Sequence, residues 1–176
     1  RFRGERPKQY MALCGRPIIR RAVECFIAHP RVDDVLAVIH PDDRALFDRA
    51  TEGLDFLQPV VGGDNRQDSV RLGLESLAGC PPERVLIHDG ARPFAEVAMI
   101  SRVLDALEMA PGAIPALPLG DTLKRGRDGL VTGTVERQDL WRAQTPQGFR
   151  YADIAQAHGE FTGAALTYDA AVAEMA

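Results

Sequence analysis

Basic residues gather at the start of the chain in a pattern that suits phosphate binding. Four arginine and lysine side chains fall within the eight residues from Arg1 to Lys8. Gly4 and Pro7 disfavour a helix there, which favours a loop able to wrap an anion, although a solvated charge run is the commoner explanation. Only two of the 21 basic residues are lysines, Lys8 and Lys124, and a lysine kept among arginines can mark a place that needs a compact charge.

A second stretch, Gly62-Gly63-Asp64 followed by Ser69, lies between a predicted strand and a predicted helix. Paired glycines let backbone N–H and C=O groups come close to a ligand, and Ser69 would lie in the first turns of the helix. An ordinary strand-to-helix turn with a helix cap has the same spacing, so both interpretations stay open. The stretch is neither a Gly-x-Gly-x-x-Gly dinucleotide motif nor a P-loop.

A third stretch, His88 to Pro93, follows the strongest predicted strand. A carboxylate just past a buried strand, here Asp89, is well placed to hold Mg²⁺ on a polyphosphate. Arg92 could pair with a phosphate oxygen or with Asp89 itself, so a structural Asp–Arg pair remains the alternative. We expect His88 to be a hydrogen-bonded residue at the strand end, because no partner serine or cysteine is evident.

Helical and strand patterns alternate along the chain, which predicts a three-layer α/β domain with a mostly parallel sheet. Apolar residues at helical spacing predict helices at 17–27, from Pro41, at 70–77 and at 100–107. Continuous apolar runs predict buried strands at 35–39, 85–87 and 113–119, and a weaker edge strand at 56–61.

Residues 121–136 follow a different pattern. Two strand-like runs, 122–125 and 131–135, flank the turn-rich segment 126–129, which predicts a β-hairpin arm that protrudes from the domain. A floppy insertion is the alternative. No repeat, low-complexity tract or linker divides the chain, so we expect residues 1–176 to form a single domain.

Length and composition exclude several classes of protein. A chain of 176 residues, 45% of them hydrophobic, can bury a sizeable core. The net charge of −4, without a basic stripe, argues against nucleic acid as a partner. No apolar run reaches the ~18 residues of a membrane-spanning helix, so we expect no membrane partner.

The ends of the chain and its cysteines give two further expectations. Cys14, Cys25 and Cys80 are odd in number and lack metal-ligand spacing, so we expect reduced thiols in the cytoplasm. The first residues lack the apolar core of a signal peptide. The chain does not begin with Met, so we expect it to start inside a longer protein.

Together these stretches resemble one family, the 2-C-methyl-D-erythritol 4-phosphate cytidylyltransferases of the non-mevalonate isoprenoid pathway. The resemblance covers almost the whole chain, and the order of the motifs is far more specific than any one of them. The matching stretches are Arg1 to Tyr10, Gly62 to Val70, His88 to Pro93, Asp121 to Lys124, Thr134 to Arg137, Leu140-Trp141, Gln144 to Gln147 and Thr167 to Glu174.

This resemblance implies a Rossmann-like nucleotidyltransferase fold and a specific reaction. The family joins the phosphate of methylerythritol phosphate to the CMP portion of CTP, releases pyrophosphate and uses Mg²⁺. The hairpin at about 121–136 is implied to be a dimerisation arm, which makes a homodimer the expected assembly.

The resemblance also implies roles for individual residues. Arg1 and Lys8 match the pair that stabilises charge on the phosphates during transfer, and Arg137 matches the residue that holds the acceptor phosphate for attack. The cytosine-recognition segment is matched by Gly62, Gly63, Asp64 and Ser69, the Mg²⁺ and sugar-phosphate positions by Asp89 and Arg92, and the acceptor site by Thr122, Arg137, Thr145 and Thr167.

Elementary electrostatics agrees with this reaction. A phosphate monoester has a second pKa of about 6, so it is mostly ionised at neutral pH and needs no general base. The obstacle is repulsion, which amounts to roughly 4 kcal/mol for two unit charges 4 Å apart at an effective dielectric of 20. Cationic side chains and Mg²⁺ can cancel that repulsion.

The chain also departs from the family at both ends. The family's first strand and its phosphate-gripping loop have no counterpart before Arg1, and a second functional lysine has none by Ala176. We therefore expect the domain to be incomplete at both ends; whether the protein is fused to a later pathway enzyme stays open. A ribitol 5-phosphate cytidylyltransferase would differ only at the acceptor site, and a non-catalytic nucleotide-binding module would not need both Arg1 and Lys8.

Overall fold

The computed structural model describes residues 6–160 and Asp169. The helices are α1 (Ile18–Ile27), α2 (Arg44–Ala50), α3 (Arg66–Ser76), α4 (Val97–Ala106) and α5 (Tyr151–Glu160), with 3-10 turns η1 (Lys8–Tyr10) and η2 (Pro41–Asp43). The strands are β1 (Ala12–Leu13), β2 (Arg16–Pro17), β3 (Leu36–Ile39), β4 (Leu57–Val61), β5 (Arg84–Ile87), β6 (Gly112–Ala113), β7 (Ala116–Pro118), β8 (Leu123–Arg127), β9 (Leu130–Val135), β10 (Trp141–Ala143) and β11 (Gln147–Arg150).

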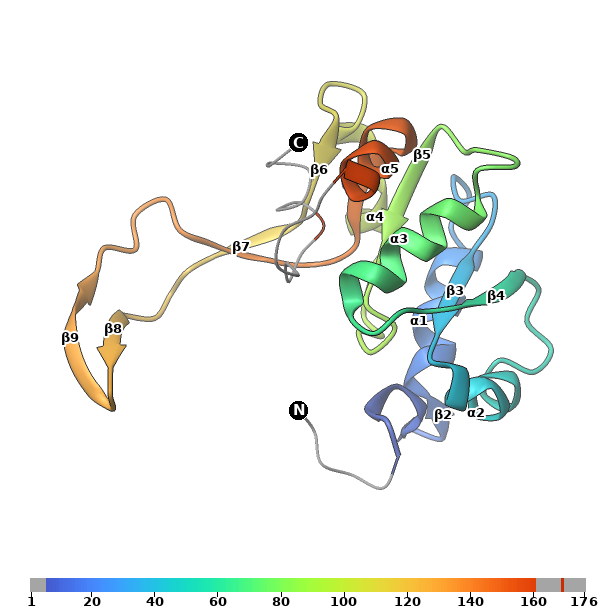
Figure 1. Cartoon of the computed structure of the whole chain (residues 1–176), viewed down its shortest axis with the longest axis horizontal. Helices are drawn as coiled ribbons and strands as arrows, with labels where there is room; N and C mark the ends of the chain where they lie inside the picture. Colours follow the sequence, from blue (N-terminus) through green and yellow to red (C-terminus); the bar gives the residue numbers. More distant parts are fainter. Residues whose placement is uncertain (1–5, 161–168, 170–176) are drawn as a thin grey trace.

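Strand β5 separates two apolar clusters, which makes the domain three layers thick. Leu86 packs against a cluster formed by Phe26 of α1 and by Ile100 and Leu104 of α4. Its neighbours on the strand pack instead against a cluster from α3, β11 and α5. Successive strand residues point to opposite faces of a sheet, so β5 has α1 and α4 on one side and α3 and α5 on the other (Figure 1).

The strands of the described residues pair in five small sheets. β3 and β4 are parallel, whereas β11 lies between β5 and β6 and is antiparallel to both. β10 pairs with β7, again antiparallel. The α/β class is thus observed, but the mostly parallel sheet expected from the sequence is not confirmed by these pairs.

The predicted strand at 113–119 is divided in the structure. β6 ends at Ala113 and β7 begins at Ala116. The two pieces join different partners, β11 and β10. Pro115 lies at the break, and a proline cannot donate a ladder hydrogen bond. The apolar run therefore supplies two short strands rather than one.

Residues 123–135 form an antiparallel hairpin. β8 pairs with β9, and the register shifts between Arg125 and Gly126. The turn uses two left-handed residues, Asp128 (φ 52°) and Gly129 (φ 79°), the geometry that matches the twist of two paired strands. Figure 1 shows this hairpin at one end of the molecule, away from the helices.

Gly148 lets β11 pass close beneath α4, and its replacement should weaken the fold. A Cβ at this position would lie 2.7 Å from Val103 and 3.0 Å from Leu107. We expect Gly148→Ala to lower the free energy of unfolding by about 1–3 kcal/mol, the usual cost of overpacking a core. Urea unfolding measures this loss.

Gly133→Ala in β9 is the matched control, because a Cβ there meets nothing within 4 Å. It should leave the unfolding midpoint nearly unchanged. Equal losses in the two variants would show that the contact with α4 is not the cause.

Within residues 6–160 and at Asp169, no helix has both the length and the apolar character needed to cross a membrane.

Candidate active site

The segment between β4 and α3 is a tight, internally bonded turn. Asn65 caps α3 by accepting a hydrogen bond from the Asp68 backbone N–H (2.9 Å). The Ser69 hydroxyl accepts from the Gly63 N–H (3.2 Å) and donates to the Asn65 carbonyl (2.8 Å). A Cβ on Gly63 would lie 2.5 Å from the Asp68 Cβ, so packing alone accounts for a glycine there. Asp64 is exposed at the outside of the turn.

Two arginines hold the carboxylate of Asp89, just beyond β5. Arg92 donates from Nε to Asp89 Oδ2 (2.8 Å), and Arg66 donates from Nε to Asp89 Oδ1 (3.2 Å). Arg92 also donates from Nη1 to the Gln144 side chain (2.7 Å). The structural Asp–Arg pair is therefore present, and it joins the end of β5 to both α3 and the segment before β11.

His88 ties Thr145 to the same loop. Its Nε2 lies 2.8 Å from the Arg92 carbonyl, and its Nδ1 lies 3.0 Å from Thr145 Oγ1. Burial lowers the pKa of His88, so the ring is neutral near pH 7. A carbonyl only accepts, so Nε2 carries the proton and Nδ1 accepts from the Thr145 hydroxyl. His88 is thus the hydrogen-bonded strand-end residue expected from the sequence.

The structure brings some of the predicted site residues together and leaves others apart. Asp89, Arg92 and Thr145 form one cluster, which Arg66 links to the turn before α3. Thr145 is only 3% exposed, so it supports the Asp89 loop from behind.

Lys8 and the hairpin residues belong to other elements of the fold. Lys8 is exposed on η1, which packs against α1 and α2. Thr122 and Arg137 flank the hairpin and are exposed, and Arg137 donates to the Gly120 carbonyl. Arg1 and Thr167, which the sequence also assigns to the site, lie outside the described residues.

Arg66 and Asp169 form the part of this cluster that the sequence did not assign. Arg66 donates from Nη1 to Asp169 Oδ2 (2.7 Å). The two residues are 103 positions apart, so no local spacing indicates the pair. The signal that identifies this pair is the burial of the Asp169 carboxylate against an arginine, and that burial is known only from the fold.

The described residues do not form a metal site by themselves. No group of three or more His, Cys, Asp or Glu side chains in the described part of the chain could hold an ion. Both oxygens of Asp89 are engaged by guanidinium groups. These donors do not fit a Mg²⁺ ion held by protein alone; Mg²⁺ commonly binds through one or two carboxylates together with substrate phosphates.

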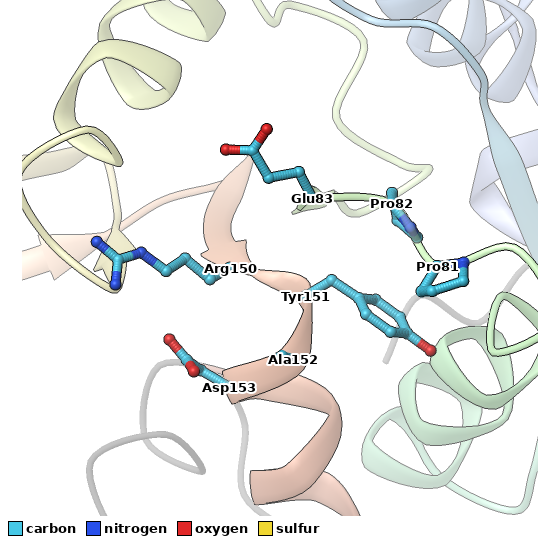
Figure 2. A pocket seen from close by; sticks show the side chains of 7 residues that line it. All are labelled: Pro81, Pro82, Glu83, Arg150, Tyr151, Ala152 and Asp153. Carbon is cyan, nitrogen blue, oxygen red and sulfur yellow. The ribbon is translucent and has the colours of Figure 1, made fainter.

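A separate open hollow lies at the opposite end of β5. It is lined by Pro81, Pro82, Glu83 and residues 150–153 (Figure 2). Glu83 precedes β5 and His88 follows it, so a four-residue strand, about 13 Å long, separates this hollow from the cluster. None of the predicted site residues that the structure describes lines it.

Comparison with known proteins decides the family. The profile of IspD, 2-C-methyl-D-erythritol 4-phosphate cytidylyltransferase, matches residues 1–176. The chain belongs to this family. The motifs noted in the sequence, from the basic stretch at the amino terminus to the stretch at 167–174, therefore occur in the order of the IspD family.

Curated relatives of the IspD family differ in length. The chain is 57% identical over 176 residues to a bifunctional enzyme IspD/IspF of Paramagnetospirillum magneticum, covering 100% of this chain and 46% of that protein. It is 50% identical over 165 residues to a 2-C-methyl-D-erythritol 4-phosphate cytidylyltransferase of Cereibacter sphaeroides, covering 92% of this chain and 72% of that protein. The chain thus spans about half the length of the bifunctional relatives it matches.

Solved structures of IspD proteins share the fold. A 4-diphosphocytidyl-2C-methyl-D-erythritol synthase superposes with a TM-score of 0.85 at 31% identity, covering 97% of this chain and 79% of that one. The synthase from Anaerococcus prevotii gives a TM-score of 0.83 at 27% identity, covering 93% and 74%.

Proposed function

We propose that the protein joins 2-C-methyl-D-erythritol 4-phosphate to CTP and releases pyrophosphate. A phosphate oxygen of the acceptor attacks the α-phosphorus of CTP, and the bond from that phosphorus to the bridging oxygen of the β-phosphate breaks. The product is 4-diphosphocytidyl-2-C-methyl-D-erythritol. The match to the IspD family over residues 1–176 is the observation that carries this proposal.

The turn between β4 and α3 is proposed to bind the cytosine. Gly62 and Gly63 are partly buried in the turn, and Asp64 presents an exposed carboxylate beside them. Ser69 holds the turn closed through Gly63 and Asn65. A rigid turn of this kind can read the base edge with little loss of conformational freedom on binding.

The phosphates are proposed to contact two sets of cations. Lys8, together with Arg1, stabilises the charge that moves onto the leaving pyrophosphate. Mg²⁺ is proposed to enter as part of the nucleotide substrate, held by the phosphate oxygens of CTP, with Asp89 as the candidate protein ligand. The support for this division is that Asp89 closely follows β5 and that each of its oxygens accepts from only one arginine among the described residues, which leaves a lone pair on each for a metal ion.

The acceptor is proposed to lie against Asp89 and Arg92, with Thr145 behind them and with Thr122, Arg137 and Thr167 completing its site. Thr122 and Arg137 flank the hairpin, so within one chain they stand apart from the Asp89 loop. A homodimer formed through β8 and β9 would place one chain's hairpin against its partner. The support is that Leu130 and Val131 on β9 are 72% and 68% exposed, so each face of the hairpin end presents an apolar side chain that a second copy can cover.

Small anionic substrates are the proposed partners, with neither nucleic acid nor a membrane involved, and the cytoplasm is the proposed location.

The substrate requirement gives the direct test. With the full-length protein, pyrophosphate release from CTP should require both methylerythritol phosphate and Mg²⁺, followed in a coupled assay. Ribitol 5-phosphate, tested beside it, should be turned over at least tenfold more slowly. Equal or faster turnover of ribitol 5-phosphate would contradict the proposed acceptor, and binding of CTP without any turnover would contradict the proposed reaction.

A further inference from the structure

One arginine bridges two carboxylates that come from distant parts of the chain. Arg66 is the first residue of α3, and it donates from Nε to Asp89 and from Nη1 to Asp169. Asp89 follows β5, whereas Asp169 lies beyond α5. The planar guanidinium offers donors in a fixed fork, so both bonds depend on a single side-chain orientation.

Asp169 depends strongly on this bond. Its side chain is 1% exposed, and a buried carboxylate is costly unless it is paired. His158 Nε2 lies 3.4 Å from its other oxygen, and the Asp169 backbone N–H donates to the Gln147 side chain (3.1 Å). Burial would raise the pKa of Asp169, but His158 and Arg66 outweigh it and lower the pKa below the ordinary value.

The bridge begins on the segment proposed to bind the nucleotide. Arg66 immediately follows the cap residue Asn65 and belongs to the same turn as Gly63 and Ser69. Its two partners come from other segments of the chain. Asp89 shares its carboxylate with Arg92, and Asp169 is two residues beyond Thr167 in the sequence. The guanidinium is therefore the link between the nucleotide segment and the segments proposed to hold the acceptor.

We propose that Arg66 is a positioning residue that holds Asp89 and Asp169 in register from the nucleotide-binding turn, and so fixes the acceptor side of the site. The inference rests on the proposed function. It assigns Arg66 no contact with substrate. A displacement of about 1 Å at such a place costs up to about 100-fold in rate, so a small loss of this register affects use of the acceptor.

Arg66→Lys is the variant that tests this role. It keeps the positive charge that Asp169 needs, but a lysine ammonium is a point charge without the fork that reaches both carboxylates. We expect kcat/KM for methylerythritol phosphate to fall about 10- to 100-fold. The dissociation constant of CTP, measured without acceptor by calorimetry on the full-length protein, should change less than about twofold.

A second variant and a control separate positioning from simple stability. Asp169→Asn should show the same loss of acceptor use. The double variant should be no worse than the worse single variant, because both changes break one link. Arg71→Lys alters another arginine of α3, which pairs with Glu75 at the surface (2.6 Å), and should leave both constants unchanged.

Three results would overturn the proposal. A folded Arg66→Lys protein with unchanged kcat/KM for the acceptor would show that Arg66 does not position the acceptor side. Equal losses of CTP binding and acceptor use, in proportion to the fall in melting temperature, would show the same. Additive losses in the double variant would show that the two residues act separately. If the wild-type protein does not turn over methylerythritol phosphate, the proposed function fails first, and the inference fails with it.

Discussion

Replacing Lys8 with alanine is expected to lower kcat by about 100- to 1,000-fold and to leave the protein folded. Removing one donor that stabilises charge in the transition state costs this much in well-studied enzymes. Lys8 is exposed on η1 and makes no ion pair with any described residue, so its loss leaves no buried charge unpaired. The measurement is steady-state pyrophosphate release, with circular dichroism to check the fold.

The control for Lys8 removes a similar charge nearby without touching the phosphates. Arg44 lies on α2, which packs against η1, and it pairs with Asp48 at the surface (2.9 Å). Arg44→Ala should retain a kcat within about twofold of the wild type, since a surface pair contributes little. A near-normal rate for Lys8→Ala would remove Lys8 from the proposed catalytic residues.

Replacing Arg137 with alanine is expected to impair use of the acceptor and to spare the nucleotide. A hydrogen bond to a charged group contributes roughly 1.5–3 kcal/mol, so kcat/KM for methylerythritol phosphate should fall by about 10- to 150-fold. Arg137 is exposed beyond β9, and its present contact is the Gly120 carbonyl, so stability should change little. Initial rates measured against each substrate in turn separate the two effects.

Arg127→Ala provides the comparison for Arg137. Arg127 ends β8 at the turn of the hairpin. The Arg127→Ala variant therefore removes a guanidinium group from the same arm, but at its far end. This variant should keep its acceptor kinetics. A collapse of CTP affinity in Arg137→Ala would mean that the acceptor and nucleotide subsites are placed wrongly.

Local patterns predicted most of the helices and buried strands of this fold. The apolar residues after Pro17 recur on one face, and α1 indeed begins at Ile18 and ends at Ile27. The run ending at Ile39 appears as β3, and the weaker run through Pro59 appears as β4, which pairs with β3. These elements depend on residues that are close together in the chain, and a periodic pattern contains that local information.

Long-range pairing explains what the sequence could not predict. β11 (Gln147–Arg150) has one large apolar residue, Phe149, yet it lies between β5 and β6. The sequence patterns of β11 and α5 do not predict these elements, because the elements become buried only through partners that are distant in the chain.

The candidate site divides in the same way. The Asp89–Arg92 pair is three residues apart and could be predicted as an alternative from spacing. The Arg66–Asp169 pair spans 103 positions and could not. The roles assigned to Lys8, Arg137 and the cytosine-binding turn stay predictions that the experiments above test.

The bridged cluster also has a consequence for how substrates approach. Arg66 and Arg92 carry two positive charges, and Asp89 and Asp169 carry two negative ones, so at neutral pH the four cancel. Such a quadrupole exerts little pull beyond the Debye length of about 8–10 Å. Long-range steering of two anions must then come from cations outside the cluster, and ionic strength should slow encounter chiefly through those peripheral charges.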